Sequence, residues 1–410
     1  MSEAGLRAIS ALGFFSMIGI AWLCSSDRRR VAWRTVAWGV AIQGLLGLLL
    51  LRTGAGRAFF AGVNEAVSRL LTYSDAGARF VFGALADTGF SFVVNVLPII
   101  VFMGSFFAVL YHLGVMQRVV DALAVLLSRS MRLSGAESLA AVANVFMGMV
   151  ESALVVRPYL ERMTRSELFA LMTLGMSTVA GSVLLAYVGM LGGADYAGHL
   201  VTASLLSAPA GLLVAKVMVP ETATPETAEG GHAGVERREV NVIDAAAAGA
   251  LSGLRLAAYV GALLVAFVAL IALVNDALGL VGGLFGLPEL SFQQILGFVL
   301  APVALLMGVP WADAVEVGAM LGVKTVLNEF LAYQELGTAI ASERISPRSA
   351  VIASYALCGF ANFGSLAILL GGIGGMAPDR RPEVARMGLR SILAGSLATF
   401  MTACIAGVLL

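Results

Sequence analysis

The sequence carries little charge. Only 13% of its 410 residues are Asp, Glu, Lys or Arg, whereas 59% are hydrophobic. A soluble protein of this length needs far more charge to cover its surface, so lipid must surround much of this chain. Acidic and basic residues balance at 26 each, which excludes the basic excess that would favour nucleic acid as a partner.

Motifs for catalysis and for metal binding are also missing. The chain has no Walker sequence, no His-Glu-x-x-His and no Gly-x-Ser-x-Gly. Its cysteines and histidines stand singly in or beside apolar stretches, without metal-ligand spacing; they are Cys24, Cys358, Cys404, His112, His199 and His232. These absences predict a protein that is not an enzyme, holds no cofactor and draws its energy from an ion gradient and not from ATP.

Eight apolar stretches approach the ~20 residues that a helix needs to cross a membrane. They are 8–24, 36–51, 92–113, 168–191, 200–219, 256–274, 350–372 and 392–410. The first lacks a basic leader and a small-residue cleavage site, so it is predicted to be a spanning helix. Eight crossings place most Lys and Arg residues on the cytoplasmic side. The sequence therefore predicts a multi-pass protein of the bacterial inner (plasma) membrane with both termini outside.

The chain has two similar halves. Residues 220–247 form the only long polar stretch, and its Pro/Glu/Thr/Gly composition predicts a cytoplasmic linker. On either side of it, an apolar segment with one glutamate, Glu151 or Glu329, precedes a predicted span and is followed by Gly-Ser and Gly-Gly pairs. The first unit is entered from the cytoplasm and the second from outside, so the repeats are inverted. Inverted repeats with interrupted helices are typical of secondary transporters, whose site lies where the repeats meet.

Two buried carboxylates are the strongest sign of a site. A carboxylate at membrane depth costs a few kcal/mol unless it faces a cavity or a partner. Glu151 and Glu329, the latter beside Asn328, either line such a cavity or tie the structure together by hydrogen bonds. Their matching positions in the two repeats favour the cavity.

Amides and one lysine complete the polar residues of the apolar regions. Asn144 and Asn362 lie beside interrupted helices, whose free carbonyls suit a hard cation or sugar hydroxyls. Hydrogen bonding between helices explains such amides equally well. Lys324 either reaches an interface or has a buried partner.

Several motifs resemble the concentrative nucleoside transporter family, to which NupC-like proteins belong. The resemblance runs from about residue 90 to the C-terminus. It rests on the segments Asn144–Glu151, Val155–Tyr159, Val179–Val183, Asn328–Phe330, Ser354–Ser365 and the Gly-Gly-x-Gly-Gly-x-Ala-Pro run at 371–378. The run Tyr-Ala-Leu-Cys-Gly-Phe-Ala-Asn-Phe within Ser354–Ser365 is its most specific element.

The resemblance implies an all-α polytopic membrane protein of eight transmembrane helices plus two re-entrant helical hairpins in inverted repeats, with scaffold and transport domains. Residues 1–90 would form N-terminal scaffold helices. Residues 91–219 would form the first repeat with its hairpin at 134–165, and 248–410 the second, with its hairpin at 311–343. Amphipathic helices would precede the hairpins near 117–132 and 291–309, and the chain would assemble as a homotrimer.

The implied function is import of nucleosides by elevator-type alternating access, driven by sodium or protons. Glu329, Asn362 and Ser365 would bind the ribose hydroxyls, with Asn328 beside them. Phe360 would pack on the base, Val183 would line its pocket, and Glu151 would reach it directly or through water. A sodium site would fall on the side chains of Asn144 and Thr178 and the carbonyls of Met147 and Val179.

The first hairpin departs from the family pattern at two positions. Met149 and Val150 stand where the family usually has a Gln and a Thr or Ser that hydrogen-bond the base. This apolar pair favours an alternative cargo, a modified nucleoside or another ribosylated small molecule. A membrane-embedded gating or structural subunit that transports nothing is a further alternative.

Overall fold

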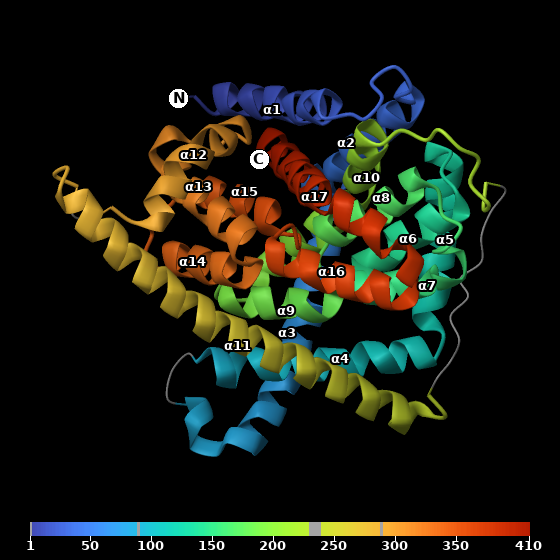
Figure 1. Cartoon of the computed structure of the whole chain (residues 1–410). Helices are drawn as coiled ribbons and strands as arrows, with labels where there is room; N and C mark the ends of the chain where they lie inside the picture. The colour runs from blue at the N-terminus through green and yellow to red at the C-terminus, as the bar shows by residue number, and fades with distance from the viewer. Residues whose placement is uncertain (1, 88–90, 229–238, 288–289) are drawn as a thin grey trace.

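Helices make up the regular structure of the described residues, which confirms the predicted all-α class. The computed structural model describes residues 2–87, 91–228, 239–287 and 290–410 (Figure 1). The N-terminal part comprises α1 (Glu3–Leu23), α2 (Trp33–Arg52), α3 (Gly54–Phe82), η1 (Gly83–Asp87), η2 (Phe92–Val96) and α4 (Leu97–His112). The first repeat continues with α5 (Val115–Met131), α6 (Gly135–Phe146), α7 (Met149–Val155), η3 (Arg157–Tyr159), α8 (Arg165–Ser177), α9 (Gly181–Met190), η4 (Ala194–Tyr196) and α10 (Ala197–Met218). The second comprises α11 (Val242–Gly283), α12 (Phe292–Leu306), α13 (Trp311–Val326), α14 (Glu329–Ala341), α15 (Pro347–Leu357), α16 (Phe363–Met376), η5 (Pro378–Arg380) and α17 (Arg381–Leu409).

The predicted spans fall on helices, but two of them are broken. Seven helical stretches of the described residues are long and apolar enough to cross a membrane. One of these stretches, Arg165–Met190, is interrupted between the end of α8 and the start of α9. The span predicted at 350–372 is instead α15 and α16, because the Asn362 side chain accepts a hydrogen bond from the Ser365 amide at 2.7 Å and begins a new helix.

Each repeat contains a helix–break–helix hairpin, as predicted. The chain is extended at Met147 and Gly148 between α6 and α7, and again at Asn328 between α13 and α14. The helices expected before the hairpins are α5 and α12. α12 and α13 meet at 116°, so the chain turns sharply before it enters the second hairpin.

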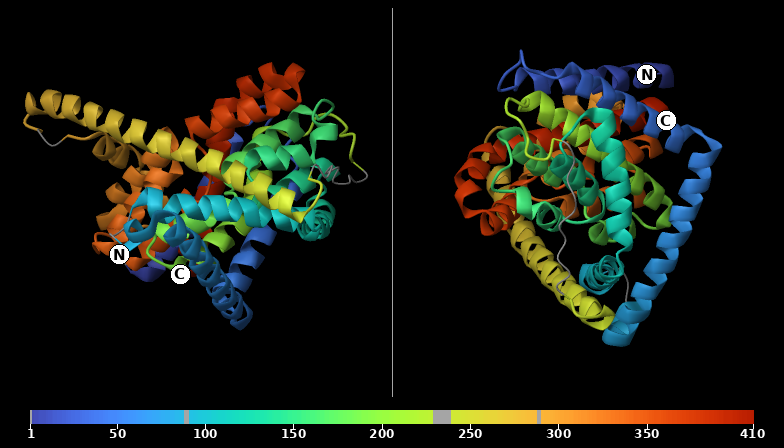
Figure 2. Two further views of the ribbon diagram at one scale, coloured as in Figure 1. Left: turned by 90° about the horizontal axis from the view of Figure 1, so that it is seen from below. Right: turned by 90° about the vertical axis from the view of Figure 1, so that its right-hand side faces the viewer.

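Helix α3 lies in the region 1–90 that was expected to form scaffold helices, but no apolar stretch predicted it. It is 29 residues long, and its charged residues form ion pairs one turn apart, Glu65 with Arg69 at 2.5 Å and Asp75 with Arg79 at 2.9 Å. These charges hide the helix from a search for apolar stretches. Figure 2 (right) shows α3 and α5 along their full length, so both run across the direction in which α4 and α9 run in Figure 1.

The linker predicted at 220–247 ends earlier in the structure. Helix α11 begins at Val242, since the Asn241 side chain accepts from the Asp244 amide at 2.9 Å and the alanine-rich sequence that follows favours a helix. Residues 229–238 of the linker lie outside the described residues.

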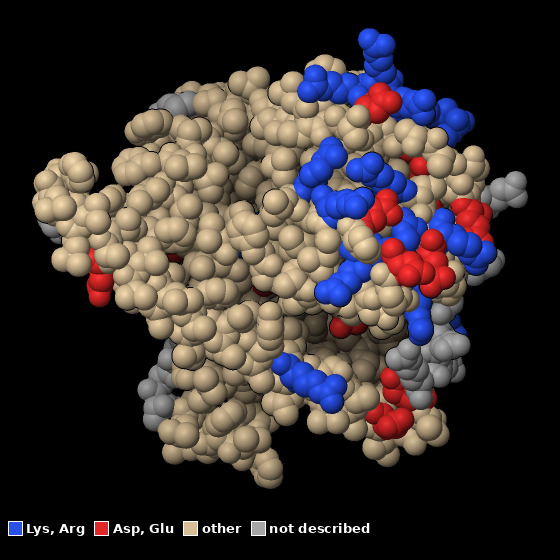
Figure 3. Space-filling model, in the orientation of Figure 1, with Lys and Arg blue, Asp and Glu red and all other residues tan. Residues whose placement is uncertain are grey.

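The segments predicted to be cytoplasmic meet on one side of the molecule. Lys and Arg side chains gather on the right of the surface in Figure 3. The Ser26 amide donates to the Met218 carbonyl at 2.8 Å, and Arg390 donates to the Cys24 carbonyl at 2.6 Å. The two ends of the chain lie close to each other, since Arg7 donates to the Leu410 carbonyl at 2.6 Å, and away from this basic side.

A buried ion pair joins three helices on this basic side. The Lys216 ammonium at the end of α10 contacts the Glu137 carboxylate at the start of α6, and the two side chains are 9% and 1% exposed. Lys216 also donates to the Ser166 hydroxyl of α8 at 3.0 Å and lies 3.4 Å from the Glu221 carboxylate. The pair therefore fixes the base of the first hairpin against α8 and α10.

Candidate functional site

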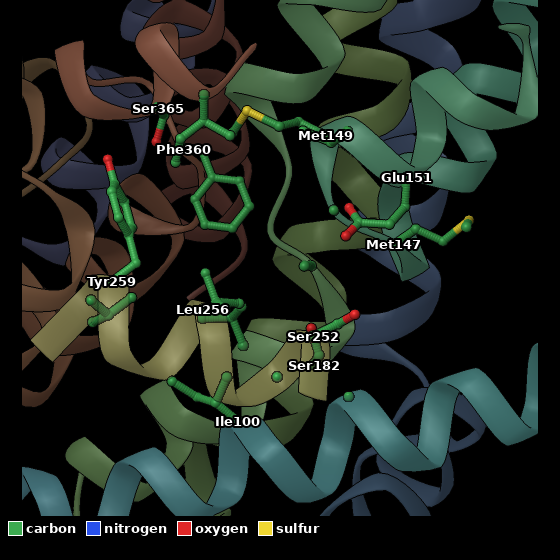
Figure 4. A pocket seen from close by; sticks show the side chains of 18 of the residues that line it. Ile100, Met147, Met149, Glu151, Ser182, Ser252, Leu256, Tyr259, Phe360 and Ser365 are labelled. Carbon is green, nitrogen blue, oxygen red and sulfur yellow. The ribbon is translucent and has the colours of Figure 1, made fainter. Parts of the chain in front are cut away.

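A cavity of about 430 Å³ lies where the two hairpin tips approach each other (Figure 4). Its walls come from the hairpin tips, the start of α9, the broken segment before α16, and from α4 and α11. All nine residues predicted to bind substrate line it: Met149, Val150, Glu151, Val183, Asn328, Glu329, Phe360, Asn362 and Ser365. The fold thus brings together residues from four separate segments, while their individual roles in binding stay predictions.

The carboxylate of Glu329 is held from two sides. The side chain is buried at 4% exposure, and its two oxygens accept from the Tyr187 hydroxyl at 3.0 Å and from the Asn362 amide at 2.8 Å. The other end of the Asn362 amide accepts from the Ser365 backbone, so the amide has one orientation. Glu329 therefore presents its remaining lone pairs to the cavity in a fixed direction, ready to accept from hydroxyl groups.

Two tyrosines that support Glu329 were missed in the sequence. The rings of Tyr187 on α9 and Tyr333 on α14 stack at 4.4 Å between centroids, and the Tyr333 hydroxyl donates to the Ser354 carbonyl at 2.8 Å. A single tyrosine in an apolar span carries no local signal of its partner. Only the matched spacing of the two repeats could have indicated that α9 and α14 lie side by side.

The first hairpin presents an apolar edge and one accessible carboxylate. Glu151 is exposed toward the cavity, in contrast to the buried Glu329, and Figure 4 shows it facing the side on which Phe360 lies. Met149 is buried at 6% and packs on α8 at Gly175, while Val150 packs on α16 at Gly372. Neither side chain can hydrogen-bond a base edge as an amide or hydroxyl would.

The opposite wall, made by α4 and α11, was also missed. These helices pack closely because Gly104 faces Gly249 and Gly253, where an added Cβ would come within 2.7 Å of backbone atoms. Ser252 and Tyr259 are polar side chains of α11 that line the cavity, and Tyr111 is a further one from α4. Ser252 and Tyr259 lie in a long apolar helix, and its sequence pattern predicts a membrane span without indicating that one face borders a cavity.

A candidate cation site lies at the first hairpin tip. Asn144 is buried at 1% exposure, and its side-chain oxygen has no hydrogen-bond partner among the described residues. The α6–α7 break adjoins the α8–α9 break, because a Cβ at Gly181 would lie 3.0 Å from the Phe146 carbonyl oxygen. Thr178 caps the end of α8 at this point, with Val179 next to it.

An unpartnered buried oxygen between two helix breaks is a fitting ligand for a hard monovalent cation. The predicted sodium ligands Asn144, Met147, Thr178 and Val179 all lie at these two breaks. Of the four, only Met147 lines the large cavity. Ion binding by these residues stays a prediction.

Family profiles of membrane transporters match nearly the whole chain. The profile described as "Na+ dependent nucleoside transporter C-terminus" matches residues 199–407, and its N-terminal counterpart matches 12–85. A profile described as "Gate: Nucleoside recognition" matches residues 93–194.

Similar proteins extend over the same length. The transporter YutK of Bacillus subtilis is 46% identical over 400 residues, which cover 97% of this chain and 98% of the relative. "Nucleoside permease NupC" of Helicobacter pylori is 40% identical over 411 residues and 97% of each chain. Human "Solute carrier family 28 member 3" is 42% identical over 98% of this chain and 60% of its own length.

Solved structures share the fold. The transporter CNTnw in an inward-facing substrate-bound state superimposes with a TM-score of 0.92 at 44% identity, over 98% of both chains. A doubly substituted variant of the same protein in an outward-facing state gives a TM-score of 0.94 at 43% identity, over 99% of this chain and 98% of the other.

Proposed function

Because this chain belongs to the concentrative nucleoside transporter family, we propose that it is a secondary active importer that moves nucleosides together with sodium. The observation that carries the proposal is the fixed Glu329–Asn362 pair in a cavity between the two hairpin tips. A carboxylate and an amide held side by side match the two neighbouring hydroxyls of a ribose. Uptake of radiolabelled nucleosides by vesicles that contain the purified chain alone tests it, and uptake equal to that of empty vesicles would instead support a non-transporting subunit.

The proposal extends to movement and assembly. The site residues come from the hairpins, α9 and α16, whereas the opposite wall belongs to α4 and α11. This division supports an elevator-type mechanism, in which the hairpin-bearing part carries the cargo past a scaffold. The chain would work as a homotrimer in the bacterial inner membrane, with both termini outside.

One testable prediction concerns the coupling of uptake to sodium. The variant Asn144→Leu should require at least about 10-fold more sodium for half-maximal uptake, since it removes a ligand oxygen whose hydrogen-bond-like contact to a charge contributes ~1.5 kcal/mol or more. Uptake is measured against sodium concentration at constant ionic strength, with Thr173→Val as the control. Like Asn144, Thr173 is buried and its side-chain oxygen has no hydrogen-bond partner among the described residues, but Thr173 lies within α8 and not at a break.

Dependence on protons would give a different result. Uptake that ignores sodium and collapses when a protonophore is added would assign the coupling to protons. With sodium as the ion, a membrane potential of 100 mV contributes ~2.3 kcal/mol per charge, enough for roughly 50-fold accumulation.

Another testable prediction concerns the base pocket. The double variant Met149→Gln with Val150→Thr should bind uridine-like cargo about 30-fold more tightly, because it restores two side-chain hydrogen bonds of ~1 kcal/mol each to the base edge. Thr has the shape of Val, so the contact of this residue with Gly372 is kept. Affinities are compared across a panel of pyrimidine and purine nucleosides.

The panel also decides between cargoes. An unchanged ranking would show that these two positions do not read the base. Tight binding of a modified nucleoside or another ribosylated molecule by the unaltered chain, with weak binding of common nucleosides, would favour the alternative cargo.

A further inference from the structure

Lys324 is buried and has no carboxylate within ion-pair distance among the described residues, although it interacts electrostatically with Glu329 at longer range. Its side chain is 1% exposed, and the ammonium donates to the Ala356 carbonyl at 2.7 Å and to the Thr399 hydroxyl at 3.1 Å. It also lies 5.8 Å from the centroid of the Phe400 ring. None of the ion pairs among the described residues includes it. The sequence left open whether Lys324 reaches an interface or pairs with another group; in the structure it is buried and its hydrogen-bond partners are neutral.

The inverted repeats give Lys324 a counterpart. The first helix of each hairpin is capped at Met147 and at Leu327, and Asn144 and Lys324 each stand three residues before the cap. The broken helices correspond in the same register: α8 is capped at Thr178 and α15 at Cys358. Lys324 thus occupies, in the second repeat, the place that Asn144 occupies in the first.

The two positions are chemically complementary. In the first repeat, the Asn144 side-chain oxygen is a buried acceptor with no hydrogen-bond partner in the part of the chain that the structure describes. In the second, Lys324 is a buried cation bound to the Ala356 carbonyl, which belongs to the last turn of α15 and lacks a helical partner. One break therefore offers oxygen atoms to a cation, whereas the other already contains a cation bound to oxygen atoms.

The cap residues differ in the same sense. Thr178 supplies a hydroxyl oxygen, a hard ligand that suits sodium, whereas Cys358 supplies a thiol, which is soft. Cys358 is fully buried and its thiol points to the Leu200 carbonyl at 3.8 Å. The second break thus lacks the hard ligand and carries the lysine.

We propose that the Lys324 ammonium is a tethered cation that takes, at the second hairpin, the place that sodium takes at the first. It fastens the second hairpin to the broken helix α15–α16 permanently, so only the first hairpin depends on a dissolved ion. The cation site at Asn144 is itself part of the proposed function, and the inference rests on it.

The test rebuilds the ligand set of the first repeat in the second. The variant Lys324→Asn with Cys358→Thr should be less stable than the parent in potassium and should recover in sodium. Its thermal midpoint should rise about twice as much per tenfold increase in sodium as that of the parent, because each ion that binds only the folded state adds the same increment. The midpoint is measured in detergent with sodium chloride replaced by potassium chloride at constant ionic strength.

The matched control is Lys324→Met with Cys358→Thr, which removes the charge without adding an amide oxygen. It should lose stability equally in both salts. If the Asn and Met variants behave alike, Lys324 is a structural tether only and the proposal is wrong. The same holds if the Asn variant is as stable as the parent in potassium.

The exchange can also be made in the other direction, which covers the case in which neither variant at Lys324 folds. Asn144→Lys should remain folded and its thermal midpoint should no longer respond to sodium. A response as large as that of the parent would overturn the proposal. The parent alone reports on the sodium site at Asn144: a parent whose midpoint ignores sodium would refute that site and the inference that rests on it. A parent that responds to sodium, with a Lys324→Asn, Cys358→Thr variant that responds no more than the parent, would refute this inference alone.

Discussion

Replacement of Glu329 by Gln should lower nucleoside uptake by about 100-fold or more while the protein still inserts and assembles. The carboxylate accepts from Tyr187 and Asn362, both of which are donors. A glutamine turns one acceptor oxygen into an amide donor, so it opposes a donor and also loses the charged acceptor for the cargo. A hydrogen bond to a charged group contributes about 1.5–3 kcal/mol, and loss of two amounts to roughly 3 kcal/mol or more.

The measurement is initial uptake into vesicles, together with binding of nucleoside to the protein in detergent. Glu335→Gln is the matched control, because Glu335 lies on the same helix, α14, but lines a different cavity with Arg344. Uptake by the Glu329→Gln variant within about threefold of the parent would remove Glu329 from the site.

The variant Lys216→Met should lower the free energy of unfolding by about 3–5 kcal/mol, since it leaves the buried Glu137 carboxylate without its partner. The loss should appear in a denaturant titration of the protein in detergent micelles. Adding Glu137→Met should recover much of it, because two apolar side chains replace a buried pair at little cost.

An exposed pair nearby supplies the comparison. Arg162 and Glu226 lie 2.8 Å apart with 68% and 41% of their side chains exposed. Arg162→Met should change stability by no more than about 1 kcal/mol, as is usual for surface pairs. Equal losses for Lys216→Met and Arg162→Met would show that the buried pair has no special role at the base of the hairpin.

The fold could be predicted where the sequence has a strong periodic or compositional signal. Apolar runs located the spans, and the glutamate and Gly-Ser pairs located both repeats. The break inside 350–372 depends on one capping side chain, Asn362, which a hydropathy pattern does not register. The break inside 168–191 has no side-chain cap at the start of α9, so it has no such signal either. Helix α3 was missed for the opposite reason, since paired charges on its surface mask a regular helix.

The site could be predicted only in part. The nine residues predicted to bind substrate, which belong to recognisable motifs, all line one cavity, as Glu329 and Phe360 do. Tyr187 could not be assigned, because its bond to Glu329 joins positions 142 residues apart in the chain and exists only after the repeats pack. Ser252 and Tyr259 lie in a helix whose apolar sequence gives no sign that one face borders a cavity.

The cavity has one wall from the hairpin-bearing part and an opposite wall from α4 and α11, which has a consequence for the design of inhibitors. Under the proposed elevator-type mechanism, a molecule that contacts only the hairpin tips, α9 and the segment before α16 would be carried along with them. A longer molecule that also hydrogen-bonds Ser252 or Tyr259 of α11 would link this moving part to the scaffold. The length of a nucleoside analogue, and not its affinity for the ribose subsite, would then decide whether it is transported or inhibits transport. Extending a good substrate toward α11 is therefore a direct route to an inhibitor of this transporter.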